Sequence, residues 1–472
     1  MPVRFVLNGQ HCEEESVSPS MTVLDYLREV RGLKGTKEGC AEGDCGACTV
    51  ALGRNKEGAL DWEAANACLM LVPQLEGMSV VTVEGVSQRD DGLHPVQQAI
   101  VDAHGAQCGF CTPGFITALY ALHKSADAID VATVHDALAG NLCRCTGYRP
   151  IVDAALSLAT VPATPEEGNA SPLSDPQESY ERDGKIFHAP SSLDRLLALR
   201  ADLPQAPLLG GGTDLGILAS KERQHFSDLI WTGAVPELKR IERDDKAVTI
   251  GAAISYTDAL PHIDELYPSF AALIRRIGSR QIRNLGTLGG NVCNASPIGD
   301  TPPCLIALGA TFIVRSSRGT RDIAADDFFV GYRETALADD EVLEAIRLPL
   351  PAENQIFRAY KVSKRFDQDI SAVIGAFDLT SNEDGSVEKA RVAFGGMAAT
   401  PARAPGCEDA IESDWGSPEA ARAAGAALDR DFSPITDFRA SADYRSRVAA
   451  NLVLRLHAEM AAPNQLTEVM AL

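Results

Sequence analysis

Cysteine is the residue type in this sequence with the clearest capacity for chemistry. The chain has 472 residues and 12 cysteines, and nine of these cysteines lie before residue 146. Two sets stand out by their spacing, namely Cys40, Cys45, Cys48 and Cys68, and then Cys108, Cys111, Cys143 and Cys145. Intracellular thiols are kept reduced, and thiolates are strong metal ligands. The spacing therefore predicts two metal centres rather than disulfides.

The first set has the spacing of a plant-type ferredoxin, in which three thiolates on one loop and a distant fourth hold a [2Fe–2S] cluster. Its loop, GLKGTKEGCAEGDCGACTV, is rich in glycine. Glycines let backbone N–H groups turn toward the negative cluster. Zinc and buried structural cysteines are the alternatives, but structural zinc sites more often have two close cysteine pairs. A [2Fe–2S] cluster is therefore predicted here.

The second set lies at the starts of two predicted helices. Cys111 comes just before the helix that Pro113 begins, and Cys145 comes before the helix that Pro150 begins. Helix dipoles favour thiolates at such positions. Taken alone, this set leaves zinc open, because Cys-x-Cys is not the common ferredoxin pattern. A second [2Fe–2S] cluster is favoured because the set follows a ferredoxin-like region.

Two glycine-rich loops follow further along the chain. LLGGGTDLG at 208–216 comes directly after an apolar strand, so its backbone could approach a pyrophosphate, although such a run is often only a tight turn. Its glycine spacing is one residue too long for the Rossmann fingerprint, so no nicotinamide-type Rossmann domain is predicted. NLGTLGGNVCNASPIGD at 284–300 has hydroxyl and amide donors without Lys or Arg, and an ordinary polar loop is the alternative.

Composition and charge restrict the class of protein. Hydrophobic residues make up 45% and charged residues 23%, which is typical of a globular protein. The net charge of −22 would repel nucleic acid and anionic membranes on average. No run of 18 apolar residues is present, and the first residues, MPVRFVLNGQHCEEE, do not resemble a secretory signal. We therefore expect a cytoplasmic protein that binds no nucleic acid and no membrane.

The elements around the cysteines follow from local patterns. An apolar strand meets an Asn8-Gly9 turn and predicts a hairpin. A helix is predicted from Thr22, with Val23, Leu24, Leu27 and Val30 on one apolar face. Four short helices are predicted between residues 94 and 160. The expected domains are 1–85 and 86–160 for the two clusters, a linker at 161–184, a mixed α/β region at 185–350, and a further α+β domain at 353–465.

The segments CAEGDCGACTV, QCGFCTPG and GNLCRCTGYRPI resemble the iron–sulfur part of the molybdenum hydroxylases, the xanthine dehydrogenase and aldehyde oxidase family. The resemblance extends over essentially the whole chain apart from the linker. It implies an α+β multidomain fold with a β-grasp ferredoxin-like domain, a four-helix iron–sulfur domain, an α+β FAD-binding domain of the vanillyl-alcohol oxidase type and a C-terminal α+β domain. It also implies that the second cluster lies nearer the molybdenum cofactor, whose pterin Gln107 would contact. The cysteines outside both sets, Cys12, Cys293, Cys304 and Cys407, are expected to pack in cores.

The resemblance also implies a set of FAD contacts. These are Leu208, Leu209, Gly210, Gly211, Gly212, Thr213, Asp214, Leu215, Ile277, Thr287, Leu288, Gly289, Gly290, Asn291, Asp300, Leu343 and Lys361. Tyr332 matches a tyrosine on the side where nicotinamide docks. One departure is Ile277, which stands where an aromatic residue often stacks on the adenine, so the adenine contact is less defined than the pyrophosphate contact.

The implied function is that of the small subunit of a xanthine dehydrogenase. Electrons from hypoxanthine or xanthine oxidation to urate would pass from molybdenum on a large partner subunit through the Cys108 cluster and the Cys40 cluster to FAD and NAD⁺. No catalytic side chain is expected in this chain, and a dimer of heterodimers is expected. The alternatives are the same role in an aldehyde or N-heterocycle dehydrogenase, a stand-alone flavoprotein diaphorase, and a zinc-bound scaffold.

Overall fold

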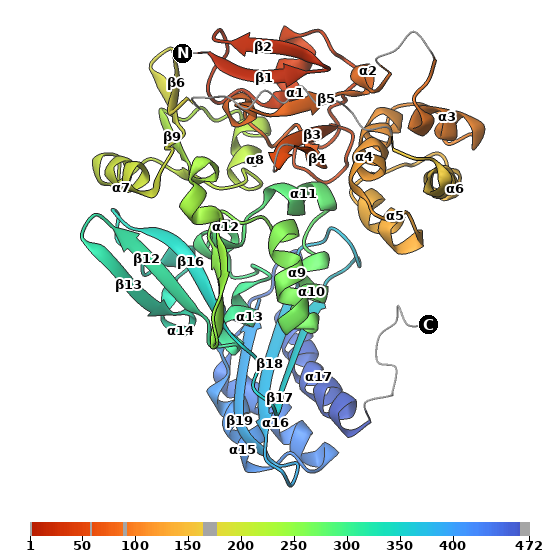
Figure 1. Cartoon of the computed structure of the whole chain (residues 1–472). Coiled ribbons are helices and arrows are strands. Elements are labelled where there is room, and N and C mark those ends of the chain that lie inside the picture. Colours follow the sequence, from red (N-terminus) through yellow and green to blue (C-terminus); the bar gives the residue numbers. More distant parts are fainter. Residues whose placement is uncertain (1, 57–58, 88–91, 164–176, 463–472) are drawn as a thin grey trace. The chain divides into compact units, whose positions relative to one another are not determined.

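The computed structural model of the chain describes residues 2–56, 59–87, 92–163 and 177–462 (Figure 1). Residues 164–176 of the predicted linker and residues 463–465 of the predicted last domain lie outside these ranges. The chain forms two compact units. Unit 1 contains Met1–Leu199, Gln205–Pro236 and Gly278–Gly286, and unit 2 contains Arg200–Pro204, Glu237–Ile277 and Thr287–Leu472. Within the described ranges, no helix is long and apolar enough to cross a membrane.

Unit 1 begins with a mixed five-stranded sheet in the order β2-β1-β5-β3-β4. Its strands are β1 (Val3–Leu7), β2 (Gln10–Glu14), β3 (Thr49–Lys56), β4 (Ala59–Asn66) and β5 (Ser79–Val81). The predicted turn joins β1 to β2, with Asn8 and Gly9 both at positive φ. Strand β1 also pairs in parallel with β5. This is the ferredoxin-like fold expected from the sequence.

A short helix covers this sheet and begins as predicted. Thr22 caps α1 (Val23–Asp25) by accepting a 3.0 Å hydrogen bond from the Asp25 N–H. The helix continues as a π-helical turn, η1 (Tyr26–Val30). The prediction that Val30 belongs to the buried face is wrong, because the wider turn rotates Val30 outward, where it is 44% exposed. Tyr26 is fully buried in its place.

The second part of unit 1 is helical. Its helices are α2 (Val83–Val86), α3 (Pro95–Asp102), α4 (Thr112–Ser125), α5 (Val131–Leu138) and α6 (Arg149–Ser157), followed by the 3₁₀ turn η3 (Leu158–Thr160). Proline occupies the first turn of α3, α4 and α6, where a missing N–H costs nothing. Helix α4 is buried over most of its length and contacts β3 and β4. The four predicted helices are therefore present, and α4 is at the centre of a hydrophobic core that they share with the sheet.

A four-stranded sheet in the order β6-β7-β9-β8 completes unit 1. Its strands are β6 (Ser179–Arg182), β7 (Lys185–His188), β8 (Leu208–Leu209) and β9 (Asp228–Trp231). The neighbouring elements are η2 (Val72–Leu75), α7 (Leu193–Asp202), α8 (Leu215–Ser220), η4 (Thr232–Ala234) and α11 (Arg280–Leu285). Phe187, Leu209 and Leu229 lie in the same buried cluster as Cys48 and Cys68. The glycine loop after β8 is therefore built on the core that holds the first cysteine set.

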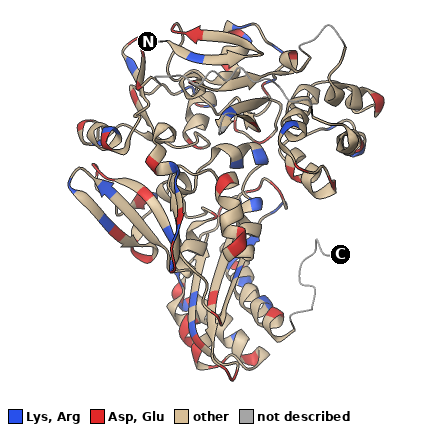
Figure 2. Ribbon diagram, viewed as in Figure 1, with Lys and Arg blue, Asp and Glu red and all other residues tan. Residues whose placement is uncertain are grey.

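Unit 2 contains two further sheets. The first has the order β10-β11-β16-β12-β13, and the second has the order β17-β18-β19-β20. The strands are β10 (Ile241–Arg243), β11 (Ala247–Gly251), β12 (Thr311–Ser316), β13 (Gly319–Ala324), β16 (Val342–Pro349), β17 (Gln355–Val362), β18 (Val373–Ser381), β19 (Val387–Gly395) and β20 (Ala402–Arg403), with a hairpin of β14 (Phe329–Gly331) and β15 (Glu334–Thr335). Acidic and basic side chains are interspersed on the ribbons (Figure 2). Ion pairs such as Arg347–Asp322 at 2.9 Å link neighbouring strands.

Helices pack on both sheets of unit 2. They are η5 (Pro236–Lys239), α9 (Tyr256–Leu266), α10 (Pro268–Arg275), α12 (Leu288–Cys293), α13 (Pro302–Ala307), α14 (Ala325–Phe328), α15 (Pro405–Ser413), α16 (Pro418–Asp431) and α17 (Ala442–Ala461). Cys304 and Cys407 are buried in this unit, and Cys12 is buried in unit 1, as predicted. Cys293, the last residue of α12, is exposed instead.

Candidate functional site: two thiol clusters and a flavin-type loop

The first cysteine set lies between the loop after η1 and the end of β4. Cys48 and Cys68 are 2% and 1% exposed, and their Sγ atoms lie 3.2 Å apart. Cys40 and Cys45 are half-buried. A Cβ at Gly39 would lie 2.7 Å from the Cys45 Sγ, and Gly43 has a positive φ. The loop therefore needs small residues to bring the four thiols together.

Hydrogen bonds favour thiolates in this set. The Cys45 thiol, followed by the N–H groups of Glu42, Cys45 and Asp44, lowers the pKa of Cys40 to about 5 against the opposing effect of burial. The pKa of Cys48 is lowered by the Cys68 thiol and by the Asn66 amide, whose Nδ2 lies 3.8 Å from the Cys48 Sγ. The pKa values of the two donors, Cys45 and Cys68, are raised correspondingly. One thiol of each pair thus ionises readily.

The second set lies at the starts of α4 and α6, as the sequence predicts. Cys111 is the N-terminal cap residue of α4, Cys143 is 5% exposed, and Cys108 and Cys145 are both exposed. The Phe110 N–H and then the Cys145 thiol lower the pKa of Cys108. Burial raises the pKa of Cys111 to about 12.

Cys143 resembles Cys48 in having donors of its own. Burial opposes ionisation of its thiol, but the Thr146 hydroxyl, 3.1 Å from the Cys143 Sγ, and nearby N–H groups lower its pKa overall. Both sets therefore contain a readily ionised thiol beside a thiol that keeps its proton.

Neighbouring thiols in both sets influence one another in pairs, which favours [2Fe–2S] clusters over zinc. The Cys48 and Cys68 Sγ atoms lie 3.2 Å apart, and the neighbouring thiols Cys45, Cys145 and Cys143 contribute to the pKa shifts of Cys40, Cys108 and Cys111 respectively. In the part of the chain that the structure describes, no three His, Cys, Asp or Glu side chains converge as for a single metal ion. A tetrahedral zinc would need four ligands around one point, whereas a [2Fe–2S] cluster needs two thiolates at each of two irons. The donor sets therefore fit two [2Fe–2S] clusters.

The loop 208–216 in unit 1 presents free backbone donors. For the described residues, none of the N–H groups of Gly211, Gly212, Thr213 and Asp214 donates a hydrogen bond to the protein. A Cβ at Gly211 would lie 1.6 Å from the Leu285 carbonyl oxygen, and Gly212 has a φ of +83°. A Cβ at Gly216 would lie 2.2 Å from the Leu69 carbonyl oxygen. Successive unpaired N–H groups form a nest for phosphate oxygens, so this loop fits a dinucleotide pyrophosphate.

The second predicted phosphate loop, in unit 2, is different. The N–H groups of Leu288 and Gly289 donate to the carbonyls of Ile254 and Ala252, both at 3.1 Å. The N–H of Gly290 donates to Thr287 Oγ1 at 3.0 Å, and the N–H of Asn291 donates to the Thr287 carbonyl at 3.1 Å. These amides therefore already have acceptors, and any contact with a cofactor would fall mainly to side chains.

Asp300 forms a buried ion pair in unit 2. Lys361 Nζ donates to Asp300 Oδ2 at 2.6 Å and to the Arg276 carbonyl at 3.0 Å. Ser371 Oγ donates to Asp300 Oδ1 at 2.5 Å. Asp300 and Lys361, both predicted FAD contacts, are thus partners of each other. Neither has a free charge, so a ligand would meet a neutral pair.

The remaining predicted residues lie in varied environments. Leu343 is buried in β16, and Ile277 is half-buried against the main core of unit 2. Tyr332 is 64% exposed between β14 and β15. In unit 1, Gln107 is exposed beside Cys108, and Asp214 is exposed at the start of α8.

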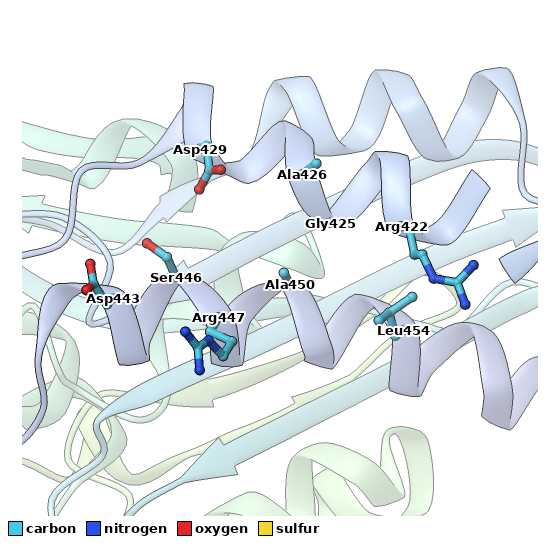
Figure 3. Close-up of a pocket in the computed structure, with 9 residues that line it drawn as sticks. All are labelled: Arg422, Gly425, Ala426, Asp429, Asp443, Ser446, Arg447, Ala450 and Leu454. Atoms are coloured by element: carbon cyan, nitrogen blue, oxygen red, sulfur yellow. The ribbon is translucent and has the colours of Figure 1, made fainter. Parts of the chain in front are cut away.

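A groove of about 560 Å³ lies between α16 and α17 in unit 2. Gly425 and Ala450 lie at its floor, where the helices meet, and Arg422, Arg447, Asp429 and Asp443 stand around it (Figure 3). None of the predicted cofactor residues lines this groove, so it is separate from the predicted cofactor sites.

Sequence reasoning missed the polar contacts behind the first cysteine set. Asn141 is 2% exposed, and its Oδ1 accepts a 2.7 Å hydrogen bond from Gln281 Nε2. Gln281 belongs to α11, and two other residues of this helix also make polar contacts. Asn284 Nδ2 donates to the Ala64 carbonyl at 2.9 Å, and Arg280 pairs with Asp136 at 3.0 Å. The local sequence RQIRN gives no signal of these contacts, because a short run of polar residues is equally typical of an exposed helix.

Four family models match the chain in sequence order. They are the 2Fe-2S iron-sulfur cluster binding domain at 5–73, the [2Fe-2S] binding domain at 82–156, the FAD binding domain in molybdopterin dehydrogenase at 179–351, and the CO dehydrogenase flavoprotein C-terminal domain at 358–460.

Curated relatives resemble the chain over most of its length. Xanthine dehydrogenase 2 of Arabidopsis thaliana is 33% identical over 84% of this chain and 35% of its own length, and xanthine dehydrogenase/oxidase of Gallus gallus is 30% identical over 87% and 36%. The chain thus spans about a third of the length of these relatives.

The similar solved structures each correspond to one part of the chain. A chain of carbon monoxide dehydrogenase from Hydrogenophaga pseudoflava is 31% identical with a TM-score of 0.55, covering 58% of this chain and 96% of that one. A chain of quinoline 2-oxidoreductase from Pseudomonas putida 86 is 27% identical with a TM-score of 0.54, covering 59% and 96%. With paired thiols, a phosphate nest and these matches in order, the chain belongs to the molybdenum hydroxylase family and contains its two [2Fe–2S] domains and its FAD-binding domain.

Proposed function

We propose that this chain is the electron-transfer subunit of a xanthine dehydrogenase. A molybdopterin-binding partner would oxidise hypoxanthine and xanthine to urate, and NAD⁺ would be the final acceptor. The relatives named xanthine dehydrogenase are 33% and 30% identical to this chain over 84% and 87% of its length, which supports this choice. A dimer of such heterodimers is the assembly proposed.

The residues of the chain would hold and separate three redox groups. When bound, the clusters exchange single electrons and FAD exchanges electron pairs with NAD⁺. The Cys40 and Cys108 sets would supply the thiolates, and the free amides of Gly211 to Asp214 would bind the pyrophosphate. The other predicted contacts, Asp300 and Lys361 among them, are proposed as further FAD ligands.

Two contacts in unit 1 support the order in which electrons would travel. Leu69, directly after Cys68, has its carbonyl oxygen against Gly216 and Gly212 of the glycine loop. Electrons that reach the Cys40 set therefore have a close route to the loop proposed to hold FAD. In the Cys108 set, in contrast, Cys108 and Cys145 are exposed and available to a partner.

Exposed apolar side chains next to the Cys108 set are evidence that a partner subunit docks there. Phe110, Leu142 and Tyr148 are 49%, 40% and 39% exposed, and they lie beside the exposed Cys108, Cys145 and Gln107. Exposed aromatic and aliphatic side chains grouped in this way mark interaction surfaces. We therefore place the molybdopterin-binding partner on this face. Tyr332 is proposed to lie on the side where nicotinamide binds.

The observation that carries the proposal is the gathering of eight thiols into two four-membered groups of unequal exposure. The test is to replace Cys145 by Ser in the complex purified with its partner. We expect xanthine-dependent NAD⁺ reduction to be lost while NADH-driven dye reduction is largely kept, because NADH would enter at the flavin. Equal loss of both activities in a folded, flavin-loaded variant would contradict the proposed order of transfer.

A second candidate is the same electron-transfer role for another substrate of the family. The solved structures similar to the chain include a carbon monoxide dehydrogenase and a quinoline oxidoreductase. Assaying the purified complex with xanthine, an aldehyde, quinoline and carbon monoxide separates these possibilities. A chain that is complete as a diaphorase would reduce dyes with NADH but would show no molybdenum-containing partner on purification.

A further inference from the structure

The two cysteine sets are connected by one backbone hydrogen bond. The N–H of Leu142 donates to the Cys45 carbonyl oxygen at 3.0 Å. Cys45 belongs to the first set, and Leu142 is covalently joined to Cys143 of the second. Cys45, this hydrogen bond, Leu142 and Cys143 therefore form a continuous bonded route between the two sets.

Close backbone packing surrounds this hydrogen bond. A Cβ at Gly46 would lie 2.3 Å from the Gly140 carbonyl oxygen and 2.9 Å from the Asn141 Cα. A Cβ at Gly114 would lie 2.2 Å from the Gly46 carbonyl oxygen. All of these are contacts with main-chain atoms, which cannot rotate away as side chains can. Glycine is therefore required on both sides for the two cysteine loops to approach this closely.

The buried side chain of Asn141 fixes the distance between the two cysteine loops. Asn141 Nδ2 donates to the Gly46 carbonyl oxygen at 3.1 Å, and Thr49 Oγ1 donates to the same oxygen at 2.7 Å. Gln281 Nε2 holds the Asn141 Oδ1 at 2.7 Å. Because these groups are buried, breaking one contact leaves a polar atom without a partner, which makes the arrangement rigid.

We propose that the Cys45 carbonyl and the Leu142 amide form the bridge by which electrons pass between the two cysteine sets, and that Gly46 and Asn141 hold this bridge at its working length. The inference rests on the proposed function, since it requires both sets to hold iron. One electron leaves the second set, which is oxidised, and arrives at the first set, which is reduced. No covalent bond forms or breaks, and no proton moves.

The alternative is that this contact only packs two loops together. In that case any substitution that strains the backbone equally near a cysteine set would have the same effect. The chain offers a matched pair for this comparison. Gly46 has a φ of +66° and follows Cys45, whereas Gly147 has a φ of +69° and lies two residues after Cys145, with no atom within 4 Å of its would-be Cβ.

The experiment compares Gly46→Ala, Gly147→Ala and the parent protein, each isolated with iron already bound. Iron analysis first establishes that both sets are loaded. Photoreduced free flavin then delivers a pulse of electrons to the exposed Cys108 set, and rapid-freeze electron paramagnetic resonance follows their arrival at the Cys40 set. Spin coupling between the sets in dithionite-reduced protein gives a second readout that needs neither substrate nor NAD⁺.

We expect Gly46→Ala to slow arrival at the first set by about tenfold and to weaken the spin coupling, because a small displacement has large effects on transfer. Gly147→Ala should behave like the parent. If Gly46→Ala does not fold, Asn141→Ala keeps the loop glycines and should give a smaller loss of the same kind.

Two outcomes would overturn the bridge. One is a fully loaded Gly46→Ala or Asn141→Ala protein that transfers electrons at the parent rate. The other is equal slowing by Gly147→Ala. Failure of the parent protein to bind two irons in each set would instead contradict the proposed function, so the two failures are distinguishable.

Discussion

The two cysteine sets have the same ligands but opposite surroundings. In the first, Cys48 and Cys68 are part of a hydrophobic core together with Leu69 and Leu209. In the second, Cys108 and Cys145 are exposed on loops that begin two helices. Two thiols of the first set are thus core residues, whereas two thiols of the second set lie at the surface.

This difference indicates a division of labour. A buried centre is shielded from water and from adventitious oxidants, so it suits transfer within the chain. An exposed centre can be approached by a partner, which suits entry of electrons from outside. The following predictions test this comparison, beginning with the largest expected effect.

Removing one ligand from each set should affect stability very differently. Cys68→Ser places a hydroxyl in an apolar core and removes a buried metal site, so the free energy of unfolding should fall by several kcal/mol, about 3 or more. Cys145→Ser changes an exposed residue and should leave the thermal midpoint of unfolding nearly unchanged. Each variant should lose the iron of its own set. Equal destabilisation measured by calorimetry would contradict the distinction between the sites.

Alkylation of the metal-free protein should separate the sets by reactivity. Thiolates react and thiols do not, and access is also required. At pH 7 Cys108 is exposed and has a lowered pKa, so iodoacetamide should modify it first. Cys111, with a pKa of about 12, should stay unmodified and become reactive only as the pH rises. Mass spectrometry that found Cys68 modified as fast as Cys108 would show that the first set is not shielded.

Two glycines allow a smaller test of packing. Gly43 and Gly109 have φ values of +84° and +81°, so alanine would strain both backbones alike, by about 1–2 kcal/mol. A Cβ at Gly43 would also lie within 2.8 Å of the Leu69 and Ile282 side chains, whereas Gly109 has open space. Gly43→Ala should therefore unfold at the lower temperature. Similar midpoints would mean that the first loop can adjust.

Surface ion pairs near each set should matter least. Lys221 pairs with Glu42 near Cys40, and Arg149 pairs with Asp153 near Cys145. Both pairs are solvent-exposed, and such pairs contribute little because water and salt screen them. Lys221→Ala and Arg149→Ala should each shift the thermal midpoint less than Gly109→Ala does. A larger shift that disappears in high salt would reveal an unexpected electrostatic role.

Local sequence signals predicted much of the first unit. Thr22 caps a helix, prolines begin α4 and α6, and the Asn8-Gly9 turn joins two strands, because each depends on residues close in sequence. The position of Val30 was not predictable in this way, since the π-helical turn that exposes it arises from packing of Tyr26 in the core. Cys293 was misplaced because a short helix has little periodicity to read.

Local sequence patterns could not predict contacts between residues that are far apart in the chain. The region predicted as one domain at 185–350 contributes to both units, and the domain limits remain predictions. The difference between the free amides of Gly211 to Asp214 and the paired amides of Leu288 to Asn291 depends on acceptors far away in sequence. The same holds for Asn141, whose partners Gly46 and Gln281 lie on opposite sides of it in the chain. The cofactor roles of the individual residues therefore remain to be tested.

The burial of Cys48 and Cys68 also has a consequence for biogenesis. Iron donors cannot reach thiols that are enclosed by the finished core, so the buried centre must be built before the domain closes, while the surface centre can be added to the folded protein. We expect isotopic iron supplied late during synthesis to appear only in the surface centre. A maturation factor for the inner centre would then have to act on the nascent chain.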